Sequence, residues 1–408
     1  MSDQPVSGSV PALPYAGLRV LDASQGLAGP YCAMLLAQHG AQVLKLEPPD
    51  GDWSRGIGRR YGEQTGLALA CNRGKLGLAI DMKRPGAVDV VQRVASRCDV
   101  VIESFRPGVA DRLGLGYEAL SAANAGLVYA SVSGYGQQGP YAERPGTDTV
   151  LQAFSGMMSF NRDASGRPNR IGFLVVDMLT GLYTFQAIAS ALYARLAGGG
   201  GRRLDVSLMQ ASAAFLGLKI IEAALEGDQP KALNAPAGVY RARDGWIAVT
   251  LSKEDHFTAL CQALERPDLR ADPRYANFEG RATHLRELME SISATMLQRD
   301  SRDWLDRIAA AGGLANPVNT IQDWLADPHV QATDAAPQVD VPGVGRIGVA
   351  RIPGVAFPAA DDPRSRWPGI GSDGARVLAE LGFADAEIER LRAEAILIDK
   401  AAPAGVGA

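Results

Sequence analysis

The side chain of Asp177 is the first candidate for chemistry, because it begins a long apolar stretch that ends at the four glycines 198–201. No charged residue lies between Asp177 and Arg195, so the stretch predicts a helix buried on all sides at the centre of a large domain. Backbone N–H groups and the positive end of the helix dipole favour an anion at such a helix start. On position alone, the ordinary role of this aspartate is to cap the helix.

Other familiar catalytic groupings are missing from the sequence. None of the four histidines lies within five residues of another, which disfavours a histidine-based metal cluster, and the four cysteines form no C-x-x-C pair. There is no G-x-x-x-x-G-K-[ST] phosphate loop, no H-E-x-x-H helix and no nucleophile elbow. Carboxylates are the remaining candidates for catalysis, and no metal is expected.

A G-x-G-x-x-G sequence runs from Gly134 to Gly139, directly after a predicted strand. A dinucleotide site of this type requires a helix to open at the last glycine, whereas Pro140 and Pro145 bracket a polar loop and no helix is expected to follow. A nicotinamide oxidoreductase rests on this sequence alone and is disfavoured. We expect instead a glycine-rich active-site loop, whose N–H groups are one candidate for stabilising oxyanions.

The composition is that of an ordinary globular protein, with 47% hydrophobic and 21% charged residues in a chain of 408. A net charge of −4 provides no electrostatic footprint for nucleic acid or for an anionic membrane. The scattered cysteines indicate reduced thiols, and residues 1–14 lack a basic, apolar signal segment. We therefore expect a cytoplasmic protein, with frayed tails at residues 1–14 and 401–408.

The first half of the chain alternates strands with helices, which predicts a doubly wound, Rossmann-like α/β domain. Pro30 suits the first turn of a helix and Gly40 its end, between two buried strands. The long polar segment 48–66 is predicted to be a functional loop. The expected strands cover 17–24, 41–47, 98–104 and 126–136 with its exit loop, and the expected helices cover 30–40, 85–96 and 177–195.

A change of character near residue 227 predicts a second, smaller α+β domain. Its hairpin, GVYRARDGWIAVTL, has a turn at Asp244–Gly245, and amphipathic helical segments follow at 256–264, 284–298 and 301–311. The predicted division is a large domain in residues 1–225, a small domain in residues 230–330, and a C-terminal segment, 331–408, that returns to the large domain.

Four stretches carry a resemblance that no single motif provides. They are LDASQGLAGPYCAMLLAQHGAQVLKLEPPDGD, DVVIESFRPGVADRLGLGYEAL, SVSGYGQQGPYAERPGTD and VVDMLTG. Together they resemble the family III CoA-transferases, which include formyl-CoA and carnitine CoA-transferases and the related 2-methylacyl-CoA racemases. Each stretch alone is weak, but the four in order, within about Leu13 to Leu391, make the resemblance very specific.

The resemblance implies a mechanism in which Asp177 attacks the thioester carbonyl of an acyl-CoA donor. A mixed anhydride forms, and the released CoA thiolate attacks it to give an aspartyl-CoA thioester and the free donor acid. An acceptor carboxylate then repeats the sequence in reverse. CoA and acyl-CoA are therefore expected as substrates, no tightly bound cofactor is expected, and the helix start is expected to keep Asp177 ionised.

Matching the family's motifs position by position implies a set of CoA contacts. Without the resemblance, Arg112 is a solvated helix charge and Phe105 an ordinary core residue. Gly181, one turn after Asp177, leaves room for the thioester or simply for close helix packing. Asp148 matches an acidic residue near the nucleophile, or else caps a loop. The implied CoA-binding residues are Gly26, Leu27, Ile80, Lys83, Ser104, Phe105, Arg112, Gly134, Tyr135, Gly136 and Asp148.

The sequence departs from the family pattern at several of these positions. Ser104 replaces a common asparagine, and Pro48 replaces an arginine, so a phosphate contact is expected from Arg55, Arg59 or Arg73. Leu27 replaces the glutamine beside the thioester in formyl-CoA transferase, and that enzyme's mobile glycine-rich loop has no counterpart, which disfavours formate and oxalate. A medium-sized acid, aromatic or branched, is favoured by Leu27, Tyr135, Phe154, Met157 and Met158, although Phe154 is equally consistent with plain core.

Two alternatives remain within the resembled superfamily. The racemase branch pairs the matching aspartate with a histidine, but the corresponding turn here is Gly146-Thr147-Asp148. Threonine cannot take a proton near neutral pH, which disfavours a two-base racemase or epimerase. A non-catalytic acyl-CoA-binding homologue is opposed by the presence of Asp177 together with Gly181.

Members of the resembled family form interlocked homodimers, in which each chain is an open ring threaded by the other. The resemblance therefore implies an obligate homodimer with a very large interface. Residues 200–230 and 325–350 would be the linkers of the ring.

Overall fold

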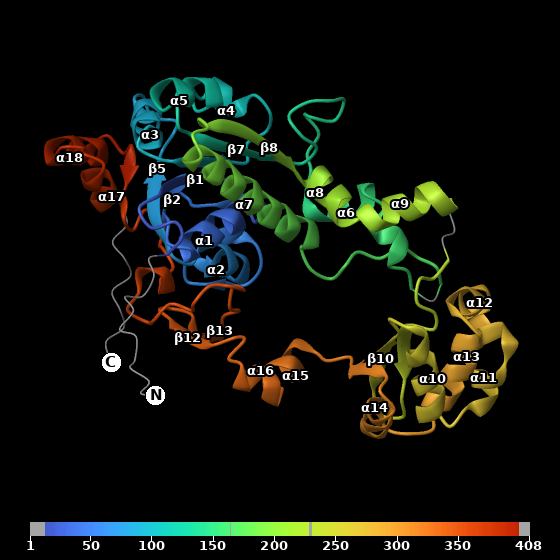
Figure 1. The fold of residues 1–408 in the computed structure, drawn as a ribbon. Coiled ribbons are helices and arrows are strands. Elements are labelled where there is room, and N and C mark those ends of the chain that lie inside the picture. Colours follow the sequence, from blue (N-terminus) through green and yellow to red (C-terminus); the bar gives the residue numbers. More distant parts are fainter. Residues whose placement is uncertain (1–12, 164, 228–230, 400–408) are drawn as a thin grey trace, which may run out of the picture. The chain divides into compact units, whose positions relative to one another are not determined.

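A computed structural model describes residues 13–399 of the chain, apart from 164 and 228–230 (Figure 1). The predicted tail at 401–408 and nearly all of the one at 1–14 lie outside the described residues. The chain divides into two compact units, a larger one formed by Met1–Gly217 with Ala336–Ala408 and a smaller one formed by Leu218–Ala335.

The larger unit is built on a seven-stranded sheet with the strand order β14-β5-β2-β1-β6-β7-β8. Every neighbouring pair from β5 to β8 is parallel, and only β14 pairs antiparallel, with β5. Parallel strands that alternate with helices confirm the predicted α/β class. The strands are β1 (Arg19–Ala23), β2 (Gln42–Glu47), β5 (Lys75–Ile80), β6 (Val100–Glu103), β7 (Val128–Ser133), β8 (Arg202–Ser207) and β14 (Leu397–Ile398).

Helices cover both faces of this sheet, because successive residues of each buried strand point to opposite faces. Leu21 of β1 belongs to the core on one face, whereas its neighbour Val20 belongs to the core on the other. The first core is completed by α3 (Ala87–Ala95), α5 (Tyr117–Ala123), α17 (Gly374–Glu380) and α18 (Asp385–Ala393). The second is completed by α1 (Ala28–Gln38), α6 (Asp148–Phe154), α7 (Val175–Leu196) and α8 (Leu208–Phe215).

Helix α7 is not buried on all sides, so that prediction is wrong for the single chain. One side packs on α1, β7 and β8. The other leaves Leu182, Tyr193 and Leu196 exposed to 46%, 75% and 85%. The helix is long and apolar enough to span a membrane, yet it lies on the sheet as a core helix does. An all-round apolar sequence predicts burial on every side, but it does not show which side packs within the chain and which stays exposed.

The segment after β2 is more regular than the predicted loop. It contains a 3-10 helix, η1 (Trp53–Gly56), and a hairpin of β3 (Arg60–Tyr61) and β4 (Gln64–Thr65). Helix α2 (Gly66–Asn72) and strand β5 follow, and neither was predicted. Contacts with a distant part of the chain hold the segment in place, because Arg55 and Gln64 both donate to the Pro368 carbonyl, at 3.3 and 3.1 Å. Helix α6 was missed as well, because it begins only at Asp148, beyond the loop that follows Gly139.

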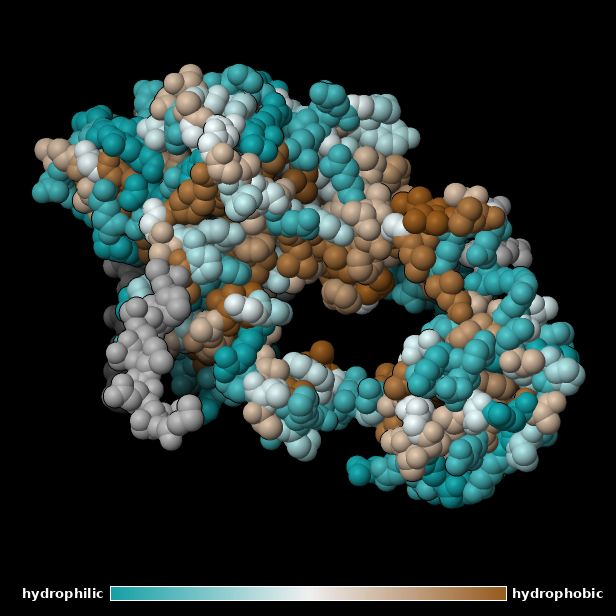
Figure 2. Space-filling view, viewed as in Figure 1, coloured by the Kyte–Doolittle hydropathy of each residue, from teal (hydrophilic) through white to brown (hydrophobic). Residues whose placement is uncertain are grey.

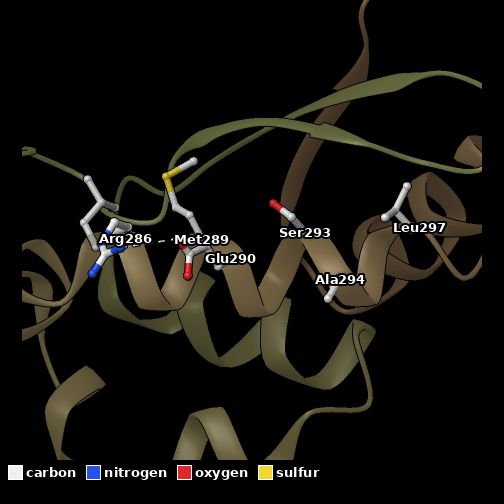
Figure 3. Close-up of a pocket in the computed structure, with 7 residues that line it drawn as sticks. Arg286, Met289, Glu290, Ser293, Ala294 and Leu297 are labelled. Atoms are coloured by element: carbon white, nitrogen blue, oxygen red, sulfur yellow. Dashed lines mark ion pairs between the residues drawn. The ribbon is translucent and has the colours of Figure 1, made fainter. Parts of the chain in front are cut away.

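The smaller unit confirms the predicted hairpin and the three helical segments. Its sheet has the order β11-β10-β9, with β9 (Gly238–Arg241) and β10 (Trp246–Thr250) antiparallel and β11 (Leu314–Pro317) not predicted. Helices α10 (Glu254–Ala263), α13 (Leu285–Met296) and α14 (Ser301–Ala310) pack around Trp304, which is 1% exposed. An open pocket follows the outer side of α13 (Figure 3), and none of the predicted site residues lines it.

The remaining elements are short, apart from the ten-residue helix α9. They are α4 (Val109–Arg112), η2 (Met157–Phe160), α9 (Gly217–Glu226), α11 (Pro267–Ala271), η3 (Pro273–Tyr275), α12 (Phe278–Thr283), α15 (Ile321–Ala326), α16 (Pro328–Ala332), β12 (Gln338–Val341), β13 (Gly345–Gly348) and η4 (Pro363–Ser365).

Candidate active site

The loops that carry the predicted site residues follow the carboxyl ends of the parallel strands. The chain runs from β1 to β2 and β5 on one side, then to β6, β7 and β8 on the other, so the strand order reverses between β1 and β6. Ligands of open α/β sheets bind at such a reversal. The Ser104 hydroxyl accepts the Gln25 N–H at 2.9 Å and thereby joins the loop after β6 to the loop after β1. The sequence predicted Ser104 only as a CoA contact and did not predict this link between the two loops.

Asp148 caps the start of α7. Its side chain is 2% exposed, and its Oδ2 accepts the N–H groups of Val176 at 2.7 Å and of Asp177 at 3.2 Å. The other oxygen, Oδ1, accepts the side-chain N–H of Gln152 at 2.6 Å, and the side-chain oxygen Oε1 of Gln152 accepts the Ile171 N–H at 2.8 Å. The capping role considered for Asp177 therefore belongs to Asp148, which leaves the Asp177 carboxyl available for chemistry.

The surroundings of Asp177 raise the pKa of its carboxyl group, whereas the sequence predicted that they would keep it ionised. Burial, and secondly the charge of Asp148, raise the pKa of Asp177 from 3.8 to about 7. The helix start was expected to keep this carboxyl ionised, but its N–H groups at residues 176 and 177 already bind Asp148. Burial, and in second place the carboxylate of Asp148, disfavour a negative charge on Asp177.

The glycine loop brings Asp148 to its place. A Cβ on Gly134 would lie 2.9 Å from the Cα of Gly146, so the two backbones touch where neither residue has a side chain. Within the loop the Gly136 N–H donates to the Ser133 hydroxyl at 3.0 Å, which engages one of the expected oxyanion donors. The Tyr135 ring packs edge-on against Phe154, with centroids 5.2 Å apart.

Gly181 allows α7 to approach the first turn of α1. A Cβ at this position would lie 2.8 Å from the Ala28 carbonyl oxygen and 2.9 Å from Cδ1 of Tyr31. The sequence suggested that Gly181 leaves room either for the thioester or for close helix packing, and the structure shows close helix packing. Asp177 lies one turn before Gly181 on α7, and Gly26 and Leu27 immediately precede the first turn of α1 that Gly181 contacts.

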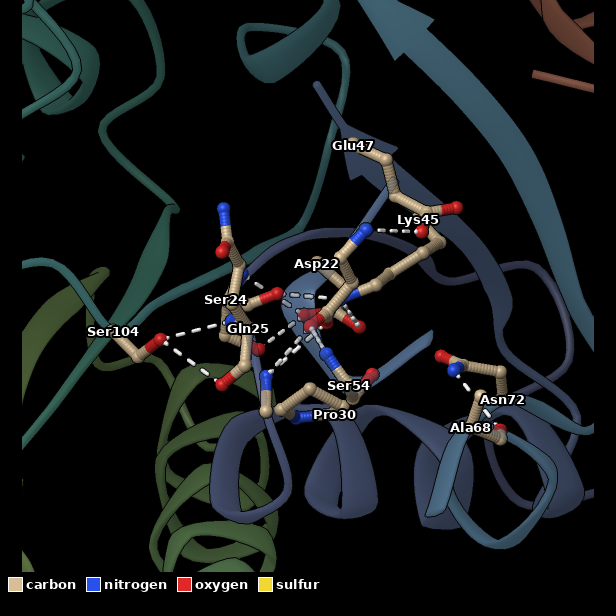
Figure 4. A network of polar contacts seen from close by, with 12 residues as sticks. Asp22, Ser24, Gln25, Pro30, Lys45, Glu47, Ser54, Ala68, Asn72 and Ser104 are labelled. Atoms are coloured by element: carbon tan, nitrogen blue, oxygen red, sulfur yellow. Dashed lines mark hydrogen bonds and ion pairs between the residues drawn. The ribbon is translucent and has the colours of Figure 1, made fainter. Parts of the chain in front are cut away.

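A network of buried charges supports that loop (Figure 4). Lys45 Nζ contacts Asp52 at 2.9 Å and donates to the Ser24 carbonyl at 2.5 Å, and Lys75 Nζ contacts Asp22 at 2.7 Å. All four charged side chains are fully buried. Asp52 in turn accepts the Gly26 N–H with both oxygens, at 3.0 and 3.2 Å. Sequence reasoning missed this network, although Asp22 and Lys45 stand inside strands that were predicted to be buried.

The network keeps its charges because each is paired. Burial opposes ionisation of Asp22 and Asp52, but the lysines outweigh it and hold the pKa of each carboxyl below its usual value. Burial likewise opposes the charge of Lys45, yet Asp22, Asp52 and Glu47 raise the pKa of that amine. A buried charge that lost its partner would be left uncompensated, so the arrangement favours one geometry of the loop.

A family model described as CoA-transferase family III matches residues 15–374. The chain belongs to CoA-transferase family III. The succinate–glutarate CoA-transferase of Agrobacterium fabrum is 33% identical over 90% of this chain and 96% of its own length. The acetyl-CoA:oxalate CoA-transferase of Acetobacter aceti is 32% identical over 92% of this chain and 98% of its own length. The crystal structure of a CAIB/BAIF family protein from Brucella suis, 32% identical, matches with a TM-score of 0.78 over 91% of this chain and 100% of its own.

As a family III CoA-transferase, the protein is a transferase whose substrates are CoA thioesters. Among the CoA contacts implied by the sequence, Lys83 and Arg112 are exposed, and both follow the carboxyl ends of sheet strands. Phe105 is half-buried, and its N–H donates to Glu103 at 2.7 Å. Ile80 is fully buried in the core, so its side chain has no free surface.

Three arginines were expected to provide the phosphate contact that Pro48 cannot make, and they differ in exposure and in the partners that they already bind. Arg55 is buried and pairs with both oxygens of Glu47, at 2.6 and 2.9 Å, so the structure excludes it as a free phosphate ligand. Arg73 is 4% exposed and lies over the Phe357 ring. Arg59 is exposed beside Tyr61.

Proposed function

We propose that the protein transfers CoA from an acyl-CoA donor to a free carboxylic acid through a thioester on Asp177. A carboxylate oxygen of Asp177 attacks the thioester carbonyl, and the CoA thiolate leaves, which forms a mixed anhydride. The thiolate then attacks the aspartyl carbonyl of the anhydride and releases the donor acid. The acceptor carboxylate attacks the aspartyl thioester, and the same two steps run in reverse.

The observation that carries this proposal is that Asp148, rather than Asp177, accepts the N–H groups at the start of α7; the raised pKa of Asp177 agrees with it. Burial and Asp148 disfavour a negative charge on Asp177, and its pKa is about 7. In the anhydride and in the thioester the aspartyl group is neutral, so formation of either removes the repulsion from Asp148. A carboxylate of higher pKa is also a more basic nucleophile. The same environment therefore disfavours the resting anion and favours the covalent intermediates.

We propose that glycine loops and aromatic side chains surround this carboxyl group. We propose that loop N–H groups after β1 and β7 stabilise the oxyanions. Phe154, with 48% of its surface exposed against Tyr135, provides an apolar contact for the acyl group. Two of the relatives named above are a succinate–glutarate and an acetyl-CoA:oxalate CoA-transferase; for this chain we propose a carboxylic acid of medium size, aromatic or branched.

We also propose an interlocked, obligate homodimer. Large apolar side chains stand exposed along α7 and on Phe215 of α8 in the larger unit, and separately over most of α9, which belongs almost entirely to the smaller unit; Figure 2 shows apolar residues at the surface of each unit. On α9 they are Leu218, Ile220, Ile221 and Leu225, exposed to 56%, 53%, 59% and 79%. Apolar surface of this extent is unusual on a monomer, and a second copy would cover it. Light scattering at micromolar concentration should give twice the chain mass, and a compact monomer would contradict the proposal.

The transferase proposal is tested by Asp177→Asn with Asp89→Asn as the matched control. Both substitutions replace an aspartate in the first turn of a helix, since Asp89 lies in the first turn of α3. Exchange of CoA between an acyl-CoA and a labelled acid, followed by mass spectrometry, should fall by several orders of magnitude only in Asp177→Asn. Near-normal exchange in a folded Asp177→Asn protein would refute the mechanism.

The two alternatives predict different products in the same samples. A racemase or epimerase would incorporate deuterium at the α-carbon of a 2-methylacyl-CoA in D₂O. An acyl-CoA-binding homologue would bind the thioester without exchange. We expect exchange with the acid and no deuterium at the α-carbon.

A further inference from the structure

Trp53 is a large apolar side chain exposed between two fully buried polar residues. Its surface is 52% exposed, whereas Asp52 and Ser54, on either side, are 1% and 0% exposed. We propose that the Trp53 indole is a specificity-determining wall of the acyl site, which sets the size of the acyl group accepted beside Asp177. This inference rests on the CoA-transferase function proposed for Asp177.

The backbone that presents Trp53 is fixed by buried charges. Asp52 caps η1 by accepting the Ser54 N–H at 2.9 Å, and it is paired with Lys45 at 2.9 Å. At the other end of η1, Arg55 is held by both oxygens of Glu47. An exposed aromatic ring on such a support loses little conformational freedom when a ligand binds.

The indole lies directly on Gly26. A Cβ at position 26 would lie 2.3 Å from Cζ2 of Trp53 and 2.9 Å from Cη2, so only glycine permits the contact. Gly26 also has a φ of +85°, in the left-handed region that favours glycine. The six-membered ring of the indole therefore occupies the space that a side chain of residue 26 would fill.

Contacts within the larger unit connect this ring to the nucleophile. Gly26 lies two residues before Ala28, whose carbonyl oxygen touches Gly181, and Gly181 lies one turn after Asp177. Segment η1 follows the carboxyl end of β2, and α1 follows that of β1, the neighbouring strand. The indole therefore belongs to the same edge of the sheet as Asp177, against the loop that faces the thioester in the proposed reaction.

The position and the apolar character of the Trp53 indole determine which acyl groups the site would accept. A rigid, flat, apolar surface contacts short or planar acyl groups and blocks longer chains that would extend across Gly26. Removal of an indole opens more room than several methylene groups need, and a single methylene in a hydrophobic pocket alters discrimination by roughly 10- to 200-fold. The substrate class is therefore acyl groups of short to medium length with an apolar face.

The test compares wild type, Trp53→Phe and Trp53→Ala, with Trp246→Ala as the matched control. Trp246, in the smaller unit, is 48% exposed, so its removal also deletes a half-exposed indole. The readout is kcat/KM for formation of the CoA adduct, measured by intact mass with propionyl-, hexanoyl-, decanoyl- and benzoyl-CoA. Melting temperature and CoA affinity are measured in parallel.

Trp53→Ala should shift the ratio of kcat/KM for decanoyl-CoA over propionyl-CoA at least about tenfold towards the longer chain. Trp53→Phe, which keeps a ring over Gly26, should give a smaller shift and provides the comparison if the alanine variant does not fold. Trp246→Ala should leave the ratio unchanged. Equal losses for every acyl-CoA in the Trp53 variants would overturn the inference, since a residue that only packs on Gly26 has that effect. Absence of any adduct in wild type would instead refute the proposed function.

Discussion

The pKa of Asp177 predicts that the first covalent step depends on pH close to neutrality. With a pKa of about 7, about half of the Asp177 side chains are ionised at pH 7 and about a tenth at pH 6. Only the carboxylate attacks the thioester, so kcat/KM for adduct formation should fall about tenfold for each pH unit below 7 and level off above about pH 8. The rise of the pKa from 3.8 to about 7 corresponds to at most roughly 4 kcal/mol between the two protonation states.

A single-turnover reaction with acyl-CoA alone measures this step. Without an acceptor acid, no substrate carboxyl titrates in the range from pH 5.5 to 8.5, and the adduct is quantified by quenching and intact mass. Asp148→Asn is the informative variant, because its amide oxygen can still accept the N–H groups of Val176 and Asp177 while the charge is removed. The midpoint should move below pH 7 but stay above 3.8, since burial, the larger cause of the shift, remains.

Two results would refute this reasoning. A wild-type rate that is constant from pH 5.5 to 8.5 would show that Asp177 is ionised throughout this range. A midpoint that is the same in Asp148→Asn as in wild type would show that the Asp148 charge has no effect on Asp177. In that second case burial alone would set the pKa.

Three further predictions concern stability. Gly181→Ala places a Cβ 2.8 Å from the Ala28 carbonyl oxygen and should cost about 1–3 kcal/mol in urea denaturation. Lys45→Met leaves buried Asp52 without its cation and should cost about 3–5 kcal/mol in the same assay, whereas an unchanged midpoint would show that the pair is dispensable. Asp177 has a higher pKa in the folded state than in the unfolded state, so its protonated form stabilises the fold below about pH 4 and this stabilisation is lost as the pH rises through about 7. Asp177→Asn should therefore match wild type in melting temperature at pH 4 and exceed it at pH 8.

The sequence was most informative where one local pattern determines one element. The strand at 17–24, the helix after Pro30 and the strand at 41–47 correspond to β1, α1 and β2 to within about two residues. Asp244–Gly245 marked the hairpin of the smaller unit correctly. Such elements follow from buried apolar runs and turn residues, which are local properties.

The errors share a physical cause, which is that distant contacts determined the outcome. Segment 48–66 looked like a polar loop, but Arg55 and Gln64 are held by the Pro368 carbonyl, which lies far away in the sequence. Asp177 was correctly identified as a residue of the first turn of α7, yet its protonation depends on burial and then on Asp148, 29 residues earlier in the chain. A pairing of Lys45 with Asp52 could have been suspected, because a lysine inside a buried strand requires a counterion.

The measurement that tests the central claim most directly is the location of CoA after the protein meets an acyl-CoA donor. Intact mass under denaturing conditions should rise by one CoA, peptide mapping should place the thioester on Asp177, and hydroxylamine should remove it. Asp177→Asn, which keeps the shape of the side chain, should bind the donor without acquiring this mass. Exchange of CoA between acids in wild type with no CoA adduct on Asp177 at any stage would contradict the account.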